Sequence, residues 1–440
     1  MITDHAPLHQ KKRNSRKLWL ITGCLVGCSL YAAEREPIPP LTVERAVQLS
    51  LAHHPQLRVA EARRQAAHGR MIQAGRWSNP ELELKAEEWP VSGGGNFSDA
   101  KHTIGISQTV PYPGKKRWDR QLALGDIQNE SAQLALVKTD IERQTRAAFY
   151  KALAATNLVI VSAELLALAE TSSASVRRQM EAGAATRQEL LRVELYEEQT
   201  RAEHAALQQE CVAARQALDT WLQDVQWQQA PLSGNLEETP AEDLLQIPFE
   251  QALTRHPAWL AAQLAETQAQ HFQRRARLEP YPDVRFSLAG GRTGPAGESI
   301  LELGITLPLP LWDRSKGRQL EAEAQSRAAA ASVLVVRQEL HRTWLAACQR
   351  YRTAIEQVRL HRERVLTKAE AALEAVRTAH QEGKIPLMDL LDTQRTVAQT
   401  RLLYQQKLLE LALVQNELRA LLFPHSLSKP AQPSIDVYEK

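Results

Sequence analysis

The sequence is poor in aromatic residues and cysteine, and it has no long apolar run after its N-terminal segment. Aromatic residues make up 5% of the 440 residues, and there are only four cysteines. Beyond residue 30 no run approaches the roughly 20 apolar residues that a membrane helix needs. If this protein enters a membrane, we expect it to do so through β-strands, since only helices and closed barrels satisfy the backbone there.

The sequence also lacks an excess of charge of either sign. Lysine and arginine total 54 against 51 acidic residues, a net charge of +3. No basic block outside the N-terminus indicates a nucleic-acid surface. The glycine-flanked serine of hydrolases, the P-loop and the H-E-x-x-H zinc motif do not occur, so we expect no enzymatic activity.

The 13 histidines are scattered rather than clustered. His53, His54 and His256 lie beside prolines, and others are dispersed along a predicted helix (His341, His361 and His380). Metal ligands would have to converge on one point. We interpret these histidines as surface or packing residues, and we predict no metal site and no cofactor.

The N-terminus reads as an export signal. Five basic residues precede an apolar run over residues 18–30, which is too short to span a membrane. Leu25-Val26-Gly27-Cys28 resembles a bacterial lipobox, which would remove residues 1–27 and leave Cys28 acylated. The alternative is ordinary cleavage near Ala33, with a signal peptide over residues 1–33. Under both readings the protein leaves the cytoplasm.

Two cysteines remain after this segment, Cys211 and Cys348. Cys211 lies 200 residues before Leu411, in a repeat described below. This register favours a core-packing role for Cys211 over a disulfide.

The chain repeats itself with a period of about 200 residues. Gly183 returns as Gly383, Glu189-Leu190-Leu191 returns as Asp389-Leu390-Leu391, and Gln-Thr-Arg occurs at 199–201 and 399–401. This period is far too long for a solenoid unit. We therefore predict a duplicated protein: a first repeat over 34–223, a linker over 224–248, a second repeat over 249–423 and a tail over 424–440.

Each half contains two segments in which polar and apolar residues alternate, as in half-exposed strands. They cover residues 81–89 and 102–110 in the first half, and 283–290 and 300–307 in the second. A length of about 8–10 residues suits a tilted membrane strand.

Long helices follow each pair of strands. Residues 118–181 contain no proline and one glycine, and residues 318–382 contain neither. At about 1.5 Å per residue the first helix would be about 96 Å long. Helices returning from Gly183 and Gly383 would pack against these long helices, and in the second return helix an apolar residue recurs every seven positions (Leu390, Val397, Tyr404, Leu411 and Leu418).

The predicted architecture is mainly α-helical with a small membrane sheet. Four strands cannot close a barrel, and an open sheet would leave two unpaired edges in lipid. Three chains would supply twelve strands, an even number within the range of outer-membrane barrels. A homotrimer is therefore predicted.

The mature chain resembles the outer-membrane factors of tripartite efflux systems, the TolC family, and within it the heavy-metal efflux components of cobalt–zinc–cadmium or copper–silver type. The resemblance rests on the duplicated plan, the segment QTVPYPGKKR at 108–117, the segment GITLPLPLWDR at 304–314, and the two glycine turns. It covers nearly the full length. The subclass rests mainly on the Leu-Pro-Leu-Pro segment.

The resemblance implies an outer-membrane trimer with a 12-stranded β-barrel and a 12-helix periplasmic tunnel about 100 Å long. Gly183, Glu189 and Gly383 would lie at tip turns that a periplasmic adaptor (membrane fusion) protein grips, and an inner-membrane pump of the resistance-nodulation-division type would supply energy. Asp389 and Asp392 match the carboxylate pair that lines the closed entrance of the family.

The spacing of Asp389 and Asp392 puts both on one face of a helix, and a threefold ring of them would attract cations. The alternative is that both acids merely suit the first turn of a helix. Ile385 stands where the family often has an arginine that latches the closed state, so no latch is assigned.

The predicted function is a passive exit duct, with heavy-metal cations as the expected cargo and outer-membrane lipid around it. One alternative is a periplasmic coiled-coil adaptor or scaffold protein, against which the four strands count. Another is a drug-efflux or type I secretion duct of the same family.

Overall fold

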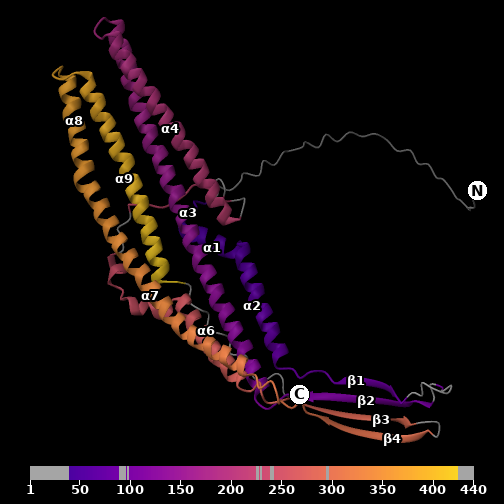
Figure 1. Cartoon of the computed structure of the whole chain (residues 1–440). Coiled ribbons are helices and arrows are strands. Elements are labelled where there is room, and N and C mark those ends of the chain that lie inside the picture. Colours follow the sequence, from indigo (N-terminus) through magenta and orange to yellow (C-terminus); the bar gives the residue numbers. More distant parts are fainter. Residues whose placement is uncertain are drawn as a thin grey trace, which may run out of the picture. The chain divides into compact units, whose positions relative to one another are not determined.

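The computed structural model describes residues 39–88, 96, 99–223, 227, 230–237, 242–293 and 297–424. The predicted signal segment, with Cys28, and the tail after residue 424 lie outside the described residues. Within them the protein is mainly α-helical with one small sheet, which confirms the expected fold class (Figure 1).

Both halves follow the same order of elements. The first half consists of α1 (Val43–His53), α2 (Pro55–Ala74), β1 (Glu81–Glu87), β2 (Lys101–Val110), α3 (Lys115–Glu181) and α4 (Arg187–Leu222). After a short 3-10 helix (Glu242–Gln246), the second half consists of α5 (Phe249–Arg255), α6 (Pro257–Ala276), β3 (Val284–Thr293), β4 (Glu298–Thr306), α7 (Lys316–Leu360), a π-helical turn (His361–Leu366), α8 (Thr367–Gln381) and α9 (Leu387–Leu422).

The two histidine–proline pairs start helices. Proline occupies the first turn of α2 and α6, where its missing N–H costs nothing. The Nδ1 atoms of His54 and His256 accept hydrogen bonds from the backbone N–H groups of Gln56 (3.4 Å) and Ala258 (3.2 Å). Both side chains are therefore N-caps, a role that fits the packing interpretation but was not foreseen. Burial lowers the pKa of both imidazoles and so favours the neutral, accepting form.

The main core lies where α3 packs against α4 and α9. Tyr351 and Phe149 are the largest fully buried side chains. Three alanines on α3 lie in the same core and let the helices approach closely (Ala148, Ala152 and Ala154). Of the apolar residues that recur every seven positions in α9, all but Leu390 are buried, so the predicted coiled-coil seam is present.

The two mature cysteines are free thiols. Cys348 is buried in the main core, and burial raises its pKa. Cys211 is half-buried on α4, with its Sγ atom 3.7 Å from the hydroxyl oxygen of Thr156. Cys348 is thus a core residue, whereas Cys211 belongs to neither buried cluster, and its predicted core-packing role stays a prediction.

The second long helix differs from the expectation. The sequence predicts an uninterrupted helix over 318–382, but the structure has a π-helical turn at His361–Leu366 between α7 and α8. No glycine or proline marks it. The turn packs against α9, and the Thr367 hydroxyl donates to the carbonyl of Arg362, five residues back. The π-helical turn therefore depends on tertiary packing, which cannot be predicted from the local composition of the chain.

One further expectation needs correction. Among the described residues, α3 contains an 18-residue window long enough and apolar enough to cross a membrane, whereas no such run is expected from the sequence beyond residue 30. In the structure 44% of that window is buried. The window is apolar because α3 is the central helix, with α1, α2, α4, α6 and α9 packed against it.

The described residues of the linker between the halves pack onto the helices. Ala230, Leu236 and Leu244 are buried in the main core. Leu41 forms two backbone hydrogen bonds with the linker, one to the Pro231 carbonyl (2.8 Å) and one from the Ser233 N–H (2.9 Å). The start of the first half is thus tied to the middle of the chain.

The four strands form one antiparallel sheet in the order β1-β2-β3-β4. Pairing of β2 with β3 joins the two halves, with Ile106 opposite Leu288 and Val110 opposite Val284. Strands β1 and β4 lie at the two edges. The observed ends of the strands lie within three residues of the ends predicted from the sequence.

Candidate functional site at the helix turns and the sheet

Each helical hairpin turns at a glycine in the left-handed conformation. Gly183 has φ = +76° and Gly383 has φ = +72°, and no atom lies within 4 Å of where a Cβ would stand at either. The residue after each glycine closes the turn with a backbone hydrogen bond. The Ala184 N–H donates to the Gln179 carbonyl (2.7 Å), and the Lys384 N–H donates to the Ala379 carbonyl (2.9 Å). Glycine is needed here for its backbone conformation and not for space.

The first tip turn is capped and the second is not. The Thr186 hydroxyl accepts from the Glu189 N–H (3.2 Å), and the Glu189 carboxylate accepts from the N–H and the hydroxyl of Thr186 (2.8 and 2.9 Å). This reciprocal pair is a capping box. In the second half Pro386 holds the N-cap position of α9 and makes no side-chain cap bond.

The cap predicts an effect of Thr186→Ala on the first tip. Loss of an N-cap hydroxyl costs about 1 kcal/mol, so amide protons in the first turn of α4 should exchange about fivefold faster. Hydrogen exchange read by mass spectrometry checks this. Thr171→Ala is the control, because the Thr171 hydroxyl only bonds back to the Ala167 carbonyl within α3; equal exchange in both variants would contradict the cap assignment.

The same cap should be sensitive to acid. Hydrogen bonds from the backbone and side chain of Thr186, aided by Arg192, lower the pKa of Glu189 below its ordinary value. A carboxyl with a depressed folded pKa stabilises the fold above its unfolded pKa, and this contribution is lost as the pH falls through the folded pKa. The protection factors of the amides at the first tip, which compare observed with intrinsic exchange at each pH, should therefore fall on acidification, and Glu189→Gln should reduce that dependence.

A small apolar cluster joins the two tips. Val176 of α3, Leu190 and Val193 of α4 and Leu391 of α9 are buried together. The second hairpin therefore docks on the first through the start of α9. The sequence did not predict this cluster, although the repeated acidic-Leu-Leu triplet contains two of its leucines.

Asp389 and Asp392 lie on the exposed side of α9, and the intervening Leu391 is buried in the tip cluster. Their side chains form no ion pair among the described residues. Arg192 of α4, at the position that corresponds to Asp392, is also exposed. The structure thus presents both carboxylates to solvent, as a gate would require.

A histidine closes the second turn. Nδ1 of His380 lies 3.2 Å from the backbone carbonyl oxygen of Ile385 and can donate to it. The corresponding residue of the first half is Met180, which packs on the tip cluster instead. Sequence reasoning missed this contact; the only signal was a basic residue three positions before the turn glycine.

The sheet has one apolar and one charged face. A row of apolar residues crosses all four strands, Leu82, Ile106, Leu288 and Leu303, and these are 47% to 81% exposed. Neighbouring rows on this face are apolar too (Leu84, Ile104, Phe286, Leu301 and Ile305). Such a face exposed to water would be a strong association surface.

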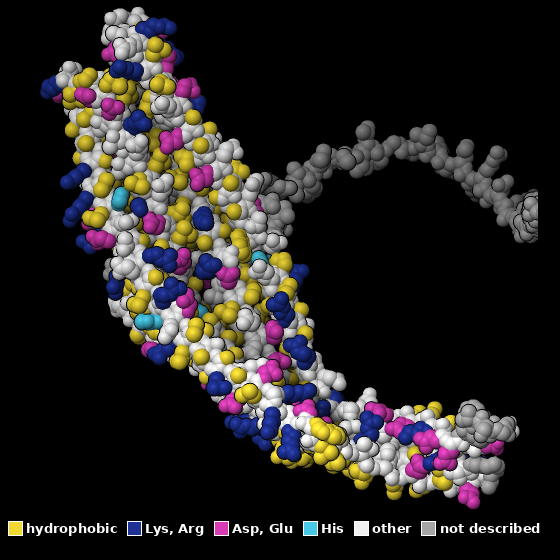
Figure 2. Space-filling model, in the orientation of Figure 1, with side chains coloured by type: hydrophobic (Ala, Val, Ile, Leu, Met, Phe, Trp, Pro, Cys, Tyr) yellow, Lys and Arg dark blue, Asp and Glu magenta, His cyan; other side chains and the backbone are white. Residues whose placement is uncertain are grey.

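The opposite face carries ion pairs. Arg285 pairs with Glu81 (2.9 Å), Lys101 pairs with Glu302, and the Ser107 hydroxyl donates to Glu83 (3.0 Å). Figure 2 shows charged side chains over the sheet and hydrophobic ones along its lower margin. This alternation is the pattern of a membrane strand with one face in lipid and one in water.

No group of three or more His, Cys, Asp or Glu side chains that could hold a metal ion occurs in the described part of the chain. The carboxylates at the tip and on the sheet are therefore candidates for attracting a passing cation rather than for coordinating one.

Comparison with known proteins agrees with this geometry. Residues 46–222 and 249–422 match the family model for outer membrane efflux proteins. The chain belongs to the outer membrane efflux protein family. It is 27% identical over 370 residues to the cobalt-zinc-cadmium resistance protein CzcC of Cupriavidus metallidurans, covering 84% of this chain and 87% of that protein. It is 26% identical over 311 residues to the nickel-cobalt-cadmium resistance protein NccC of Alcaligenes xylosoxydans, covering 69% and 67%.

Solved structures show the same fold. A membrane protein from Pseudomonas aeruginosa superposes with a TM-score of 0.74 at 19% identity, covering 86% of this chain and 93% of that one. The outer membrane protein VceC from Vibrio cholerae superposes with a TM-score of 0.72 at 17% identity, covering 87% and 96%. The recognition of the family from sequence is thus confirmed.

As an outer membrane efflux protein, this chain resides in the outer membrane, with its long helices in the periplasm. The exposed apolar face of the sheet is consistent with this location. The two glycine turns join α3 to α4 and α8 to α9, at the ends of the helical hairpins that are remote from the strands. These ends are therefore on the periplasmic side.

Proposed function

We propose that this outer membrane efflux protein acts as a homotrimeric exit duct that conducts heavy-metal cations from the periplasm to the exterior. The observation that carries the proposal is the two-faced sheet with two free edges. Its apolar face suits lipid and its charged face suits a water-filled lumen. Four strands cannot enclose that lumen, whereas twelve strands from three chains can.

The close pairing of β2 with β3 supports a sheet that curves toward its charged face when it closes into a barrel. A Cβ at Gly105 would lie 2.7 Å from the Ala289 Cβ, and one at Gly291 would lie 1.9 Å from the His102 carbonyl oxygen. Small residues on one face let a sheet bend toward that face, as at the corners of barrels. The charged face is therefore the concave, inner one.

The tips would form the periplasmic entrance. In a trimer, Asp389 and Asp392 would give six carboxylates around the threefold axis, a ring that favours cations. Gly183, Glu189 and Gly383 would present the turns to a periplasmic adaptor protein. An inner-membrane pump, of the resistance-nodulation-division type, would supply the energy, because the duct has no catalytic step of its own.

The choice of cargo rests on relatives named for resistance to cobalt, zinc, cadmium and nickel. The acidic pair at the tip is consistent with cationic cargo. A drug-efflux or secretion duct would share the fold and, by the family resemblance, an acidic pair at the tip, so the relatives named for metal resistance are what favours metal cations over those alternatives.

Deletion of the gene in its own host should lower the concentrations of zinc, cobalt and cadmium that stop growth by severalfold. Tolerance to an uncharged hydrophobic antibiotic should not change. Plasmid-borne wild-type protein should restore metal tolerance and appear in outer-membrane fractions as a heat-modifiable trimer. Sensitivity to the antibiotic with unchanged metal tolerance would reject the cargo, and recovery as a soluble periplasmic protein would reject the duct.

A further inference from the structure

The region where the helices meet the sheet is strongly basic. We call this region the junction; it comprises the four connections between helices and strands and one turn of each adjoining helix, residues 71–80, 111–118, 273–283 and 307–319. It holds ten lysine and arginine residues and three acidic ones, whereas the whole chain has a net charge of only +3. Figure 2 shows Lys and Arg side chains gathered beside a hydrophobic patch where the helical part meets the sheet.

The acidic residues of the junction already have partners. Asp283 pairs with Lys115 (2.9 Å) and accepts from the Tyr112 N–H (2.8 Å). Glu279 pairs with Arg275 and Arg318 at 2.5 and 2.6 Å. Asp313 accepts from the Ser315 N–H at 2.7 Å.

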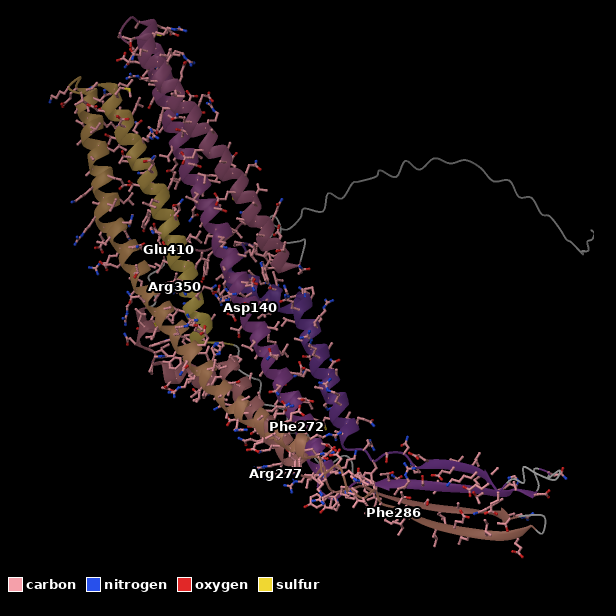
Figure 3. All side chains as sticks on the ribbon, viewed as in Figure 1. Asp140, Phe272, Arg277, Phe286, Arg350 and Glu410 are labelled. Carbon is pink, nitrogen blue, oxygen red and sulfur yellow. The ribbon has the colours of Figure 1, made fainter. Side chains whose placement is uncertain are left out.

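Six exposed cations remain: Arg76 after α2, Arg117 and Arg274 beside Trp118, Arg277 at the end of α6, and Arg314 and Lys316 at the start of α7. No ion pair to any of them occurs among the described residues. Figure 3 shows Arg277 and Phe272 at the end of the helices next to the sheet, near Phe286 on the sheet itself. The junction therefore has an excess of positive charge that its three acidic residues do not balance.

The same region exposes an apolar segment, residues 307–312. Leu307, Leu309, Leu311 and Trp312 are 46% to 93% exposed, with Trp312 the most exposed. Leu307 continues the alternation of Leu301, Leu303 and Ile305, so the segment extends the lipid-facing side of β4. Pro308 and Pro310 have no N–H groups, which reduces the number of backbone donors that lipid would leave unsatisfied.

We propose that the junction is a binding surface for anionic phospholipids of the periplasmic leaflet, with residues 307–312 inserted at the boundary between headgroups and acyl chains. Arg277, Arg314 and Lys316 bind the phosphates. Tryptophan prefers this boundary because its ring is apolar and its N–H is polar. Continuity with the apolar sheet face and the uncompensated positive charge favour lipid over a second copy of the chain. The inference rests on the membrane placement of the sheet in the proposed function.

The aromatic pairs of the junction make this surface rigid. Tyr112 and Tyr281 stack with ring centroids 4.6 Å apart, and they link the connection before α3 to the connection before β3. Arg274 and Arg117 lie over the ring of Trp118, with their guanidinium carbons 5.3 and 5.8 Å from its centroid. A rigid basic collar at one depth would set how far the duct sits in the membrane.

The first test measures lipid preference. Purified full-length trimer is titrated with phosphatidylglycerol or phosphatidylcholine, and bound lipid is counted by native mass spectrometry. We expect the wild type to prefer phosphatidylglycerol, and Arg277→Gln/Arg314→Gln/Lys316→Gln to reduce that preference about tenfold, since each basic residue near an anionic surface contributes a severalfold attraction. The control is Arg364→Gln/Lys368→Gln/Arg377→Gln. It removes three exposed positive charges from the π-helical turn and α8, which lie outside the junction. Equal loss in both variants, or no loss in the first, would overturn the proposal.

The second test locates the apolar segment. Trp312→Cys is labelled with a polarity-sensitive dye in a Cys211→Ser/Cys348→Ser background and reconstituted in vesicles. We expect a blue-shifted spectrum that is quenched by lipids carrying a nitroxide near the headgroup; Arg364→Cys should show neither effect. A water-like spectrum at 312 rejects insertion, and a blue shift without lipid quenching assigns the segment to a subunit contact instead. Trimer formation and metal resistance are read separately, so failure here is distinct from failure of the duct.

Discussion

Gly291→Val is expected to abolish the assembled, heat-modifiable trimer of this protein. Gly291 lies in β3 opposite Thr103 of β2, in the pairing that joins the two hairpins. A Cβ at Gly291 would lie 1.9 Å from the His102 carbonyl oxygen and 2.9 Å from the Thr103 Cα, so the backbones would have to separate. Unpaired backbone groups in lipid cost several kcal/mol each, which leaves the hairpins no stable arrangement in the membrane.

The matched control is Gly290→Val. Gly290 is the neighbouring residue of the same strand, but the nearest atom to its Cβ position is the Ile300 carbonyl oxygen, at 3.8 Å. Valine favours strands, so propensity alone would stabilise both variants. Unheated gel electrophoresis of outer-membrane fractions distinguishes them. Trimer yields that fall equally, or do not fall in either variant, would show that the close approach at Gly291 is not what limits assembly.

The double substitution Asp389→Ala/Asp392→Ala is expected to raise single-channel conductance and to lower cation selectivity. In the proposed trimer it removes six negative charges from the narrowest point, along with part of the side-chain bulk there. Planar-bilayer recordings give the conductance, and the reversal potential in a salt gradient gives the selectivity. Asp389→Asn/Asp392→Asn, which keeps the shape and removes the charge, should lower selectivity with a smaller change in conductance.

A control for charge elsewhere on the helices is Glu203→Ala/Glu210→Ala, two exposed acids farther along α4. This variant should retain wild-type selectivity, because exposed charges more than about 10 Å away are screened. Unchanged conductance and selectivity in Asp389→Ala/Asp392→Ala would refute the gate and leave the two acids as first-turn residues that suit the helix dipole.

The secondary structure followed from local patterns in the sequence. Strict alternation at 81–87 and 300–306 could only suit strands with two different faces, and the absence of proline from 118–181 was enough to predict α3. The period of 200 residues predicted that the second half repeats the first. These features depend on residues near one another in the chain, which sequence alone displays.

The capping roles and the irregular turn depended on contacts that local patterns do not specify. His54 and His256 cap helices through Nδ1, and His380 lies against the Ile385 carbonyl. The π-helical turn at His361–Leu366 occurs in a sequence that would make an ordinary helix, and the apolar window of α3 belongs to a packed core. A residue's neighbours across the fold decide such features.

Sequence by itself determined the element order, the duplicated plan, the family and the glycine turns, because each depends on composition and spacing along the chain. Only the tertiary structure decided that β2 pairs with β3 and that the basic end of α6 lies in the same junction as the apolar segment 307–312. It also decided that Leu391 docks one tip on the other and so leaves Asp389 and Asp392 exposed. The physical reason is that burial, backbone pairing and charge compensation are set by residues that are distant in sequence and adjacent in space.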